Sequence, residues 1–342
     1  MKFGLGQFTL QIPPWDNRTH AQLYADTLEL ARLAESSGFD SFWLAEHHGA
    51  SDGYIPSLLG FLSAVAARTE RLELGTAVML SPFHDPLRVA EDAAVLDNIS
   101  GGRLNLGIGL GWAPEEYRMF GAPTKGRGAR LSEFVEVLRG AWTGEPFTVS
   151  GKHLRYDDVL VRPAPTRRIP IYLGGGSPPA LERAARIADG HFPTSTGTLA
   201  DAAARAKEML ALRERLGVTG PYRFGMFLPI GIGADADDGW ASIRDGLLHV
   251  RGSYALWGQG KRDVAGARDE AAQWEEAIRA TTTCGTSEQV VETLAPHLRE
   301  LDGLGFEEVF VSAIIVVPGT AKSQGAEAIE RFGKEVIPAL RA

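Results

Sequence analysis

Strand-like and helix-like segments alternate along all 342 residues, and this alternation constrains the fold more than any other feature. The predicted strands cover residues 2–8, 40–45, 71–79, 103–109, 169–173, 190–193, 223–231 and 307–315. Such alternation is typical of βα units, whose strands pair in parallel. Eight units favour an α/β fold of the TIM (β/α)8 barrel type.

An open doubly wound sheet is the competing architecture. Its usual mark is a glycine-rich turn after the first strand, but Gly4 and Gly6 lie within the first predicted strand. Residues 107–111, Gly-Ile-Gly-Leu-Gly, imitate that turn only weakly at the fourth strand. The closed barrel is therefore the better prediction.

We expect a single domain over residues 1–342 with two insertions. Residues 144–168 carry turn-forming residues and short strand-like runs, which predict a hairpin before the fifth barrel strand. Residues 253–280 hold glycines, four basic residues and a polar helical pattern, so we expect a mobile insertion there. Neither stretch is long enough for a separate domain.

Charge and composition exclude several classes of protein. The net charge of −8 argues against a surface for nucleic acid or an anionic membrane. The longest apolar runs fall short of the roughly 20 residues that a membrane span needs. The N-terminus lacks a signal-peptide pattern, and Cys284, the one cysteine, cannot form an internal disulfide. We therefore expect a cytoplasmic enzyme with a small-molecule substrate.

Glu46-His47-His48 follows the second predicted strand and is the first candidate site. The carboxyl ends of parallel strands are where α/β folds place their chemistry. Side chains alternate along a strand, so at most one of the two histidines enters a shared cavity. A hydrogen-bonded structural histidine is the alternative. No metal is expected, because neither an H-E-x-x-H pair nor a cysteine cluster completes a ligand set.

Two glycine-rich strand ends are candidates for cofactor binding. Residues 169–173 lead into Gly174, Gly175, Gly176 and Ser177 and then a helix, which predicts a phosphate cradle or, alternatively, a tight βα turn. Glycines at 107 and 109 clear one face of the fourth strand for a flat ring, with Trp112 at its rim. Close strand packing or a bulge is the alternative there.

The substrate cannot be identified from the sequence. An apolar pocket would draw on aromatic residues near the strand ends. The candidates are Phe8, Trp15, Tyr54, Phe83 and Trp112.

In their order along the chain, these segments resemble the bacterial luciferase-like flavin-dependent monooxygenases over essentially its whole length. The matching residues are Gly38 to Trp43, Glu46 to His48, Gly75 to Val78, Asp85 to Asp92, Leu96 to Arg103, Gly107 to Gly109, Ile169 to Tyr172 and Gly174 to Ser177. The resemblance implies reduced FMN, supplied by a separate flavin reductase and bound at the carboxyl ends of the strands. It also implies a homodimer.

For individual residues, the resemblance implies that His47 is catalytic and that a non-prolyl cis peptide between Ala77 and Val78 supports the flavin ring. We expect further cofactor contacts at Gly109, Trp112, Gly175, Gly176 and Ser177. The implied reaction is oxygenation of a small organic substrate by O2 through a flavin 4a-hydroperoxide. His47 would manage the protons of that reaction.

Departures from the family pattern leave the cofactor open. Luciferases carry an arginine for the flavin phosphate where Leu110 stands and an acidic residue near Gly176, so phosphate binding here rests more on backbone amides. Gly111-Trp112 and residues 139–144 also resemble relatives that use an 8-hydroxy-5-deazaflavin coenzyme. A deazaflavin-dependent hydride-transfer oxidoreductase is therefore one alternative, and a non-catalytic flavin-binding protein is another.

Overall fold

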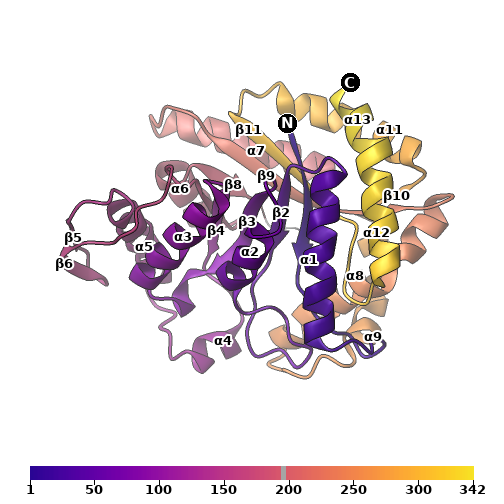
Figure 1. Cartoon of the computed structure of the whole chain (residues 1–342), viewed down its shortest axis with the longest axis horizontal. Helices are drawn as coiled ribbons and strands as arrows, with labels where there is room; N and C mark the ends of the chain where they lie inside the picture. The colour runs from indigo at the N-terminus through magenta and orange to yellow at the C-terminus, as the bar shows by residue number, and fades with distance from the viewer. Residues whose placement is uncertain (194–197) are drawn as a thin grey trace.

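The structure, a computed structural model, describes residues 1–193 and 198–342. Eight parallel strands close into a barrel, because β9 pairs with both β8 and β11 (Figure 1). The barrel strands are β1 (Lys2–Phe8), β2 (Ser41–Leu44), β3 (Glu73–Leu80), β4 (Leu104–Gly109), β7 (Ile171–Gly174), β8 (Gly190–Phe192), β9 (Arg223–Ile232) and β11 (Glu308–Ile314). The predicted TIM barrel is confirmed, and each predicted strand coincides with a barrel strand.

Helices surround the barrel (Figure 1). The longer ones are α1 (His20–Ser36), α2 (Leu58–Ala66), α3 (Pro86–Ser100), α5 (Arg127–Ala141), α6 (Pro178–Ile187), α7 (Leu199–Arg215), α8 (Ala236–Gly258), α11 (Ser287–Asp302) and α12 (Lys322–Arg331). The shorter segments are η1 (Ser81–Phe83), α4 (Pro114–Met119), α9 (Ala267–Ala271), η2 (Ala272–Trp274), α10 (Glu275–Ala280), η3 (Phe332–Val336) and α13 (Ile337–Arg341). Among the described residues, no helix combines the length and apolar character that a membrane crossing requires.

Of the two expected insertions in the βα pattern, residues 144–168 and 253–280, the second differs from the structure in part. Residues 144–168 contain the expected hairpin, formed by β5 (Phe147–Ser150) and β6 (Arg155–Val159). Residues 253–258, however, belong to the last turns of α8 rather than to an insertion. Their burial explains the difference, since Ser253, Leu256 and Trp257 are all buried. A short extra strand, β10 (Thr283–Gly285), pairs with the end of β9.

The interior of the barrel is filled by a layer of aromatic rings centred on Trp43. The rings of Phe192 and Phe310 meet its indole edge-on, with centroids 5.1 and 5.6 Å away. Gly75 on β3 makes room for this layer, because a Cβ there would lie 1.9 Å from the Trp43 ring. This aromatic layer forms the floor of the candidate site.

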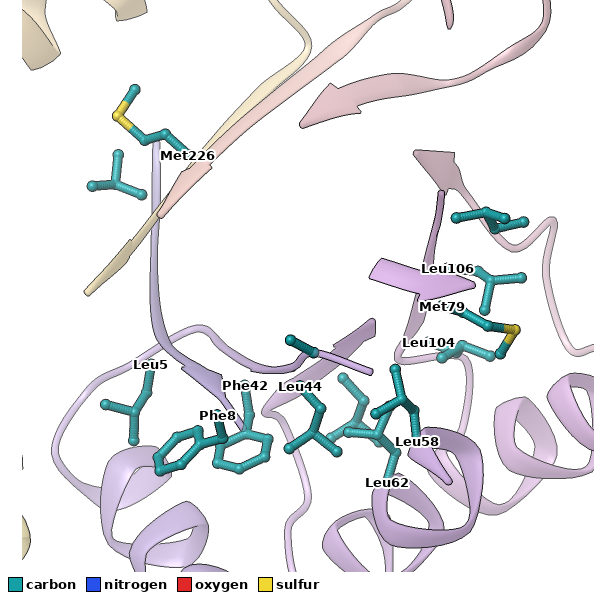
Figure 2. Packing of buried hydrophobic residues seen from close by; sticks show 14 of the residues in the cluster. Leu5, Phe8, Phe42, Leu44, Leu58, Leu62, Met79, Leu104, Leu106 and Met226 are labelled. Carbon is teal, nitrogen blue, oxygen red and sulfur yellow. The ribbon is translucent and has the colours of Figure 1, made fainter. Parts of the chain in front are cut away.

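The second layer of the core lies between the barrel and its helices. Figure 2 shows Leu44 of β2 and Leu58 and Leu62 of α2 pointing toward one another. All three side chains are buried, at 2% exposure or less. Each such side chain contributes about 1.5–3 kcal/mol by leaving water. The helices are thereby fixed against the strands whose ends carry the candidate site.

His191 on β8 makes the stability of the fold depend on pH. Its ring is fully buried, Nδ1 donates to the carbonyl of Leu173 at 2.9 Å, and burial lowers its pKa to about 4. The unfolded chain binds this proton near pH 6.5, the ordinary histidine value, and the folded chain does not. The stability that comes with a neutral His191 is therefore complete above the unfolded pKa and is lost as the pH falls toward the folded pKa.

We expect His191→Asn, which keeps a donor but cannot be protonated, to remove part of this pH dependence. Between about pH 7 and pH 4.5 it should lose roughly 2 kcal/mol less unfolding free energy than the wild type. Urea unfolding at several pH values measures the difference, with His297→Asn on the outer helix α11 as control. Equal slopes for wild type and His191→Asn would contradict the prediction.

Candidate active site

A cavity of about 580 Å³ opens at the carboxyl ends of the barrel strands. This volume lies within the range of small-molecule sites. The predicted site residues that line the cavity are His47, Ala77, Val78, Gly109, Trp112, Gly175 and Ser177. Gly176 belongs to the same loop but is not among the lining residues that the structure describes.

The floor of the cavity is the aromatic layer of the barrel, since Phe192 and Phe227 belong to both. Of the aromatic residues considered for a substrate pocket, Phe8, Tyr54 and Trp112 line the cavity. Trp15 and Phe83 do not. Trp15 packs against His249, and Phe83 belongs to a separate cluster with Tyr117. Apolar side chains make up much of the lining, and polar and charged ones, among them Gln11, Arg18 and Arg251, are placed where they could orient a ligand.

A flat surface for a ring is formed where β3 and β4 end. The peptide bond between Ala77 and Val78 is cis, as the family resemblance implies. The side-chain amide of Gln7 donates a hydrogen bond to the carbonyl of Ala77. Gly109 lies beside Val78, and a Cβ at Gly109 would come within 2.5 Å of Val78 Cγ2. Any larger residue at 109 would therefore have to displace the Val78 side chain.

Gly107, two residues before Gly109, permits close packing of the strands, which was the alternative interpretation of the glycines in this strand. A Cβ there would lie 2.1 Å from the backbone oxygen of Thr76, so this glycine permits close strand packing. The Thr76 hydroxyl also accepts from the Gly107 amide at 2.9 Å and donates to its carbonyl at 2.7 Å. The alternating glycines thus divide into one that serves the fold and one that faces the cavity.

The loop after β7 has the form of an anion cradle. Gly175 adopts φ +118°, a backbone region that side chains disfavour, and Ser177 is the N-cap residue directly before α6. Among the described residues, the Ser177 side chain makes no capping hydrogen bond to this helix. Pro178 and Pro179 have no N–H, and the Ala180 amide already donates to the Ser177 carbonyl at 2.8 Å. The candidate donors for a negatively charged group are therefore the Ser177 hydroxyl and the backbone amides of residues 175–177.

His47 is the centre of a buried hydrogen-bonded chain. Its Nδ1 lies 2.9 Å from Oε1 of Glu116 on α4, and its Nε2 lies 3.0 Å from the hydroxyl of Tyr254 on α8. Glu116 Oε1 also accepts from the backbone amide of His48 at 2.8 Å. Because a carboxylate only accepts hydrogen bonds, Nδ1 carries the ring proton and Nε2 is the basic atom. Nε2 is thus turned toward Tyr254 at the cavity wall.

The surroundings of His47 are aromatic. Its ring centroid lies 4.8 Å from that of Trp257 and 5.0 Å from that of Tyr54. Burial raises the pKa of Tyr54 well above its ordinary value, and burial raises the pKa of Tyr254 as well. Both phenols therefore stay protonated near neutral pH and act as donors. This end of the cavity therefore holds one base, with the Glu116 carboxylate behind it and aromatic side chains around it.

His48 points away from this chain, as strand alternation predicts. Its Nε2 lies 2.8 Å from Oε1 of Glu46, which also binds Nε2 of His84 at 2.7 Å. Burial would raise the pKa of Glu46, but hydrogen bonds from these two imidazoles outweigh it and lower the pKa. The sequence did not connect His84 with Glu46 and His48. In the structure, the ligand-type atoms of these three residues all lie within 4.8 Å of one another. The imidazoles already share the carboxylate through hydrogen bonds.

Sequence reasoning missed both partners of His47. Glu116 lies 69 residues further on, and Tyr254 lies 207 residues further on, in the stretch expected to be an insertion. The only sequence signal for Glu116 is the start of α4 at Pro114, soon after the fourth strand. Helices that follow parallel strands begin at the same end of a barrel, which brings Glu116 to His47.

Residues 5–305 match the family model for luciferase-like monooxygenases. A curated relative from Intrasporangium calvum, named F420-dependent glucose-6-phosphate dehydrogenase, is 31% identical over 335 residues, which cover 90% of this chain and 92% of the relative. A protein of the same name from Nakamurella multipartita is 37% identical over 177 residues, covering 50% of this chain and 52% of that protein. The chain is thus matched over about half the length of several curated relatives.

A similar solved structure is that of the monooxygenase RslO1 from Streptomyces bottropensis. It superposes with a TM-score of 0.81 and 26% sequence identity, over 99% of each chain. The relatives therefore include a protein named for F420 dependence and one named as a monooxygenase.

Proposed function

The chain belongs to the luciferase-like monooxygenase family, and from this premise we propose that it is a coenzyme F420-dependent oxidoreductase. It transfers a hydride between the deazaflavin ring and a small organic substrate. The observation that carries the proposal is the chain of Glu116, His47 and Tyr254, which places one basic nitrogen at the cavity wall. Similarity to an F420-dependent relative over nearly the whole chain supports the choice of coenzyme.

The cavity fits such a coenzyme on two counts. Gly109 leaves a face beside the Ala77–Val78 peptide on which a flat tricyclic ring can lie. Gly175 and Ser177 offer backbone amides and a hydroxyl to a phosphate at the start of α6. Leu110 stands where luciferases carry an arginine for the FMN phosphate, which weakens the case for FMN. When bound, a deazaflavin ring accepts or donates a hydride and needs no oxygen.

His47 supplies the proton transfer that must accompany hydride transfer. In the oxidation of an alcohol, hydride leaves the carbon, the substrate hydroxyl gives its proton to the Tyr254 oxygen as Tyr254 gives its own proton to His47 Nε2, and a carbonyl forms. Glu116 holds the ring in the tautomer that leaves Nε2 basic and stabilises the imidazolium that results. The Tyr254 hydroxyl, which donates to Nε2, can accept a hydrogen bond from the substrate hydroxyl and so orient it. The aromatic walls keep water from the reacting atoms.

Glu116 is therefore a positioning residue, and Glu116→Gln tests that role. We expect kcat to fall about 10- to 100-fold, because the amide cannot stabilise the imidazolium. The coenzyme Kd and the melting temperature should change little, since the amide oxygen can still accept a hydrogen bond. Glu115→Gln on the same helix, whose carboxylate pairs with Arg118 near the surface, is the matched control. Equal kcat values for the two variants would argue against the role.

An FMN-dependent monooxygenase is the second candidate function. The observation that favours it is the superposition on RslO1 over almost the full length of both chains. In that case a separate reductase supplies reduced FMN, and His47 manages protons during oxygen transfer. The two candidates use the same cavity and the same histidine, and they differ in their need for oxygen.

Turnover with and without oxygen separates the two candidates. The purified protein is mixed with oxidised coenzyme F420 and a panel of alcohols that includes glucose 6-phosphate and simple secondary alcohols. We expect coenzyme reduction at the same rate in air and under anaerobic conditions with at least one of them. Product formation that requires both oxygen and reduced FMN would replace the proposal by the second candidate.

A further inference from the structure

A second cavity, of about 100 Å³, lies beside the main one. Arg127 lines both cavities, so the two adjoin at the start of α5. The same arginine shares the lining of the main cavity with Ser177 of the phosphate cradle. The small cavity is therefore connected, through Arg127, to the cavity that contains the proposed phosphate cradle.

Positive charge without a counter-ion is concentrated around the small cavity. Arg127 and Arg130 lie one turn apart on α5, and both line it. Among the described residues, neither guanidinium has a carboxylate within ion-pair distance. The hydrogen bond of Arg127 is a long one, 3.4 Å, to the carbonyl of Gly111. Like charges one helical turn apart repel each other, so this arrangement favours an anion between them.

Arg130 gives the most specific sign of a missing partner. Its Nε atom is buried and, within the described part of the chain, has no hydrogen-bond partner. Buried donors of this kind are rare, because an unmade hydrogen bond costs about 1–3 kcal/mol. A ligand oxygen in the small cavity would remove that cost.

A third arginine extends the charge toward α6. The guanidinium of Arg183 lies so close to Gly128 of α5 that any side chain at 128 would collide with it. Burial lowers the pKa of Arg183, and among the described residues it has no ion-pair partner. Arg186, on the same helix, is by contrast paired with Glu182 at 2.8 Å. Arg183 is thus on the side of α6 that meets α5.

We propose that the small cavity is a subsite for an anionic chain that continues beyond the coenzyme phosphate. The inference rests on the proposed function, because coenzyme F420 carries such a chain, a lactyl group followed by glutamates with free carboxylates. FMN ends at its phosphate and has no group to place there. Arg127 and Arg130 would bind the carboxylates with charge-assisted hydrogen bonds. The subsite would thereby favour the tailed coenzyme over FMN.

Binding of two deazaflavins tests the subsite. The wild type is titrated with coenzyme F420 and with the deazaflavin mononucleotide, which ends at the phosphate. We expect the tail to tighten binding about tenfold or more, with a steeper salt dependence. In Arg130→Met this advantage should fall to about twofold or less, while the mononucleotide Kd stays within about twofold of the wild type. Retained mononucleotide binding also demonstrates that the variant is folded.

Arg186→Met, on the outward face of α6, is the matched control and should keep the full advantage of the tail. Equal binding of the two deazaflavins by the wild type would overturn the subsite and leave the proposed function intact. Inorganic phosphate that binds in an Arg130-dependent manner without any effect of the tail would overturn it in favour of a free-anion site. Failure of both deazaflavins to bind would overturn the subsite and the proposed function together.

Discussion

Replacing His47 by alanine is expected to lower kcat by about 10²- to 10⁴-fold, the usual contribution of a positioned general base. The ring is 5% exposed and is held at both nitrogens, so no neighbouring group can take over its role. The coenzyme Kd should change little, because the ring surface at Val78 and Gly109 and the cradle at Gly175 are untouched. Steady-state turnover and coenzyme titration measure the two effects separately.

The control for this prediction is His297→Ala on the outer helix α11, which should keep wild-type turnover. Added imidazole should restore part of the activity of His47→Ala, because it can enter the space that the ring leaves. A purely structural histidine would not be rescued in this way. Undiminished turnover by His47→Ala with intact coenzyme binding would rule out the catalytic role.

Replacing Arg103 by methionine is expected to lower the free energy of unfolding by about 3–5 kcal/mol. Arg103 precedes β4 at the end of the barrel opposite the site, and its side chain is buried. Nε donates to the carbonyl of Ser100 at 2.6 Å. The two Nη atoms bind the carbonyls of Ala66, Thr69 and Leu72 and the hydroxyl of Thr69 at 2.7–3.0 Å. Methionine fills the space but leaves these acceptors buried without donors.

Urea unfolding measures this loss, and Arg68→Met is the matched control. Arg68 belongs to the same loop region, but its guanidinium is half exposed and pairs with Glu29 at the surface. Such a pair contributes about 0–1 kcal/mol, so the control should lose little. Arg103→Lys should recover less than half of the loss, because an ammonium cannot reach all five acceptors. A loss below about 1 kcal/mol for Arg103→Met would refute the account.

Arg103 also shows that a residue can contribute to a family resemblance without belonging to the site. The segment from Leu96 to Arg103 contributes to the resemblance, yet it lies far from the cavity and serves the fold. The strands were predictable because each is a short apolar run between helices with recognisable caps. Thr19, for example, accepts a hydrogen bond from the Gln22 amide in a capping box. Local signals of this kind were sufficient for the barrel.

The site was less predictable because its polar partners are distant in sequence. His47 and its position at a strand end were evident, but Glu116 comes from the six-residue helix α4 and Tyr254 from the far end of α8. No local pattern connects these residues, and their approach depends on the closed barrel. Polar residues and glycines made the end of α8 resemble a loop, although Trp257 there is buried.

The two glycines of β4 were ambiguous for a different reason. Gly107 and Gly109 are equivalent by alternation, but the register between β3 and β4 shifts between Thr76 and Met79. That irregularity brings the backbone of Thr76 against Gly107 and leaves Val78 beside Gly109. A strand register cannot be read from one sequence, so only the structure assigns the two glycines their separate roles.

Equilibrium binding of the two cofactor types tests the central claim most directly. Coenzyme F420 and FMN, each oxidised and reduced, are titrated into the purified protein, and their dissociation constants are compared. We predict that F420 binds at least about tenfold more tightly than FMN, a difference of about 1.4 kcal/mol. FMN binding that is tighter than F420 binding in both redox states would contradict the account.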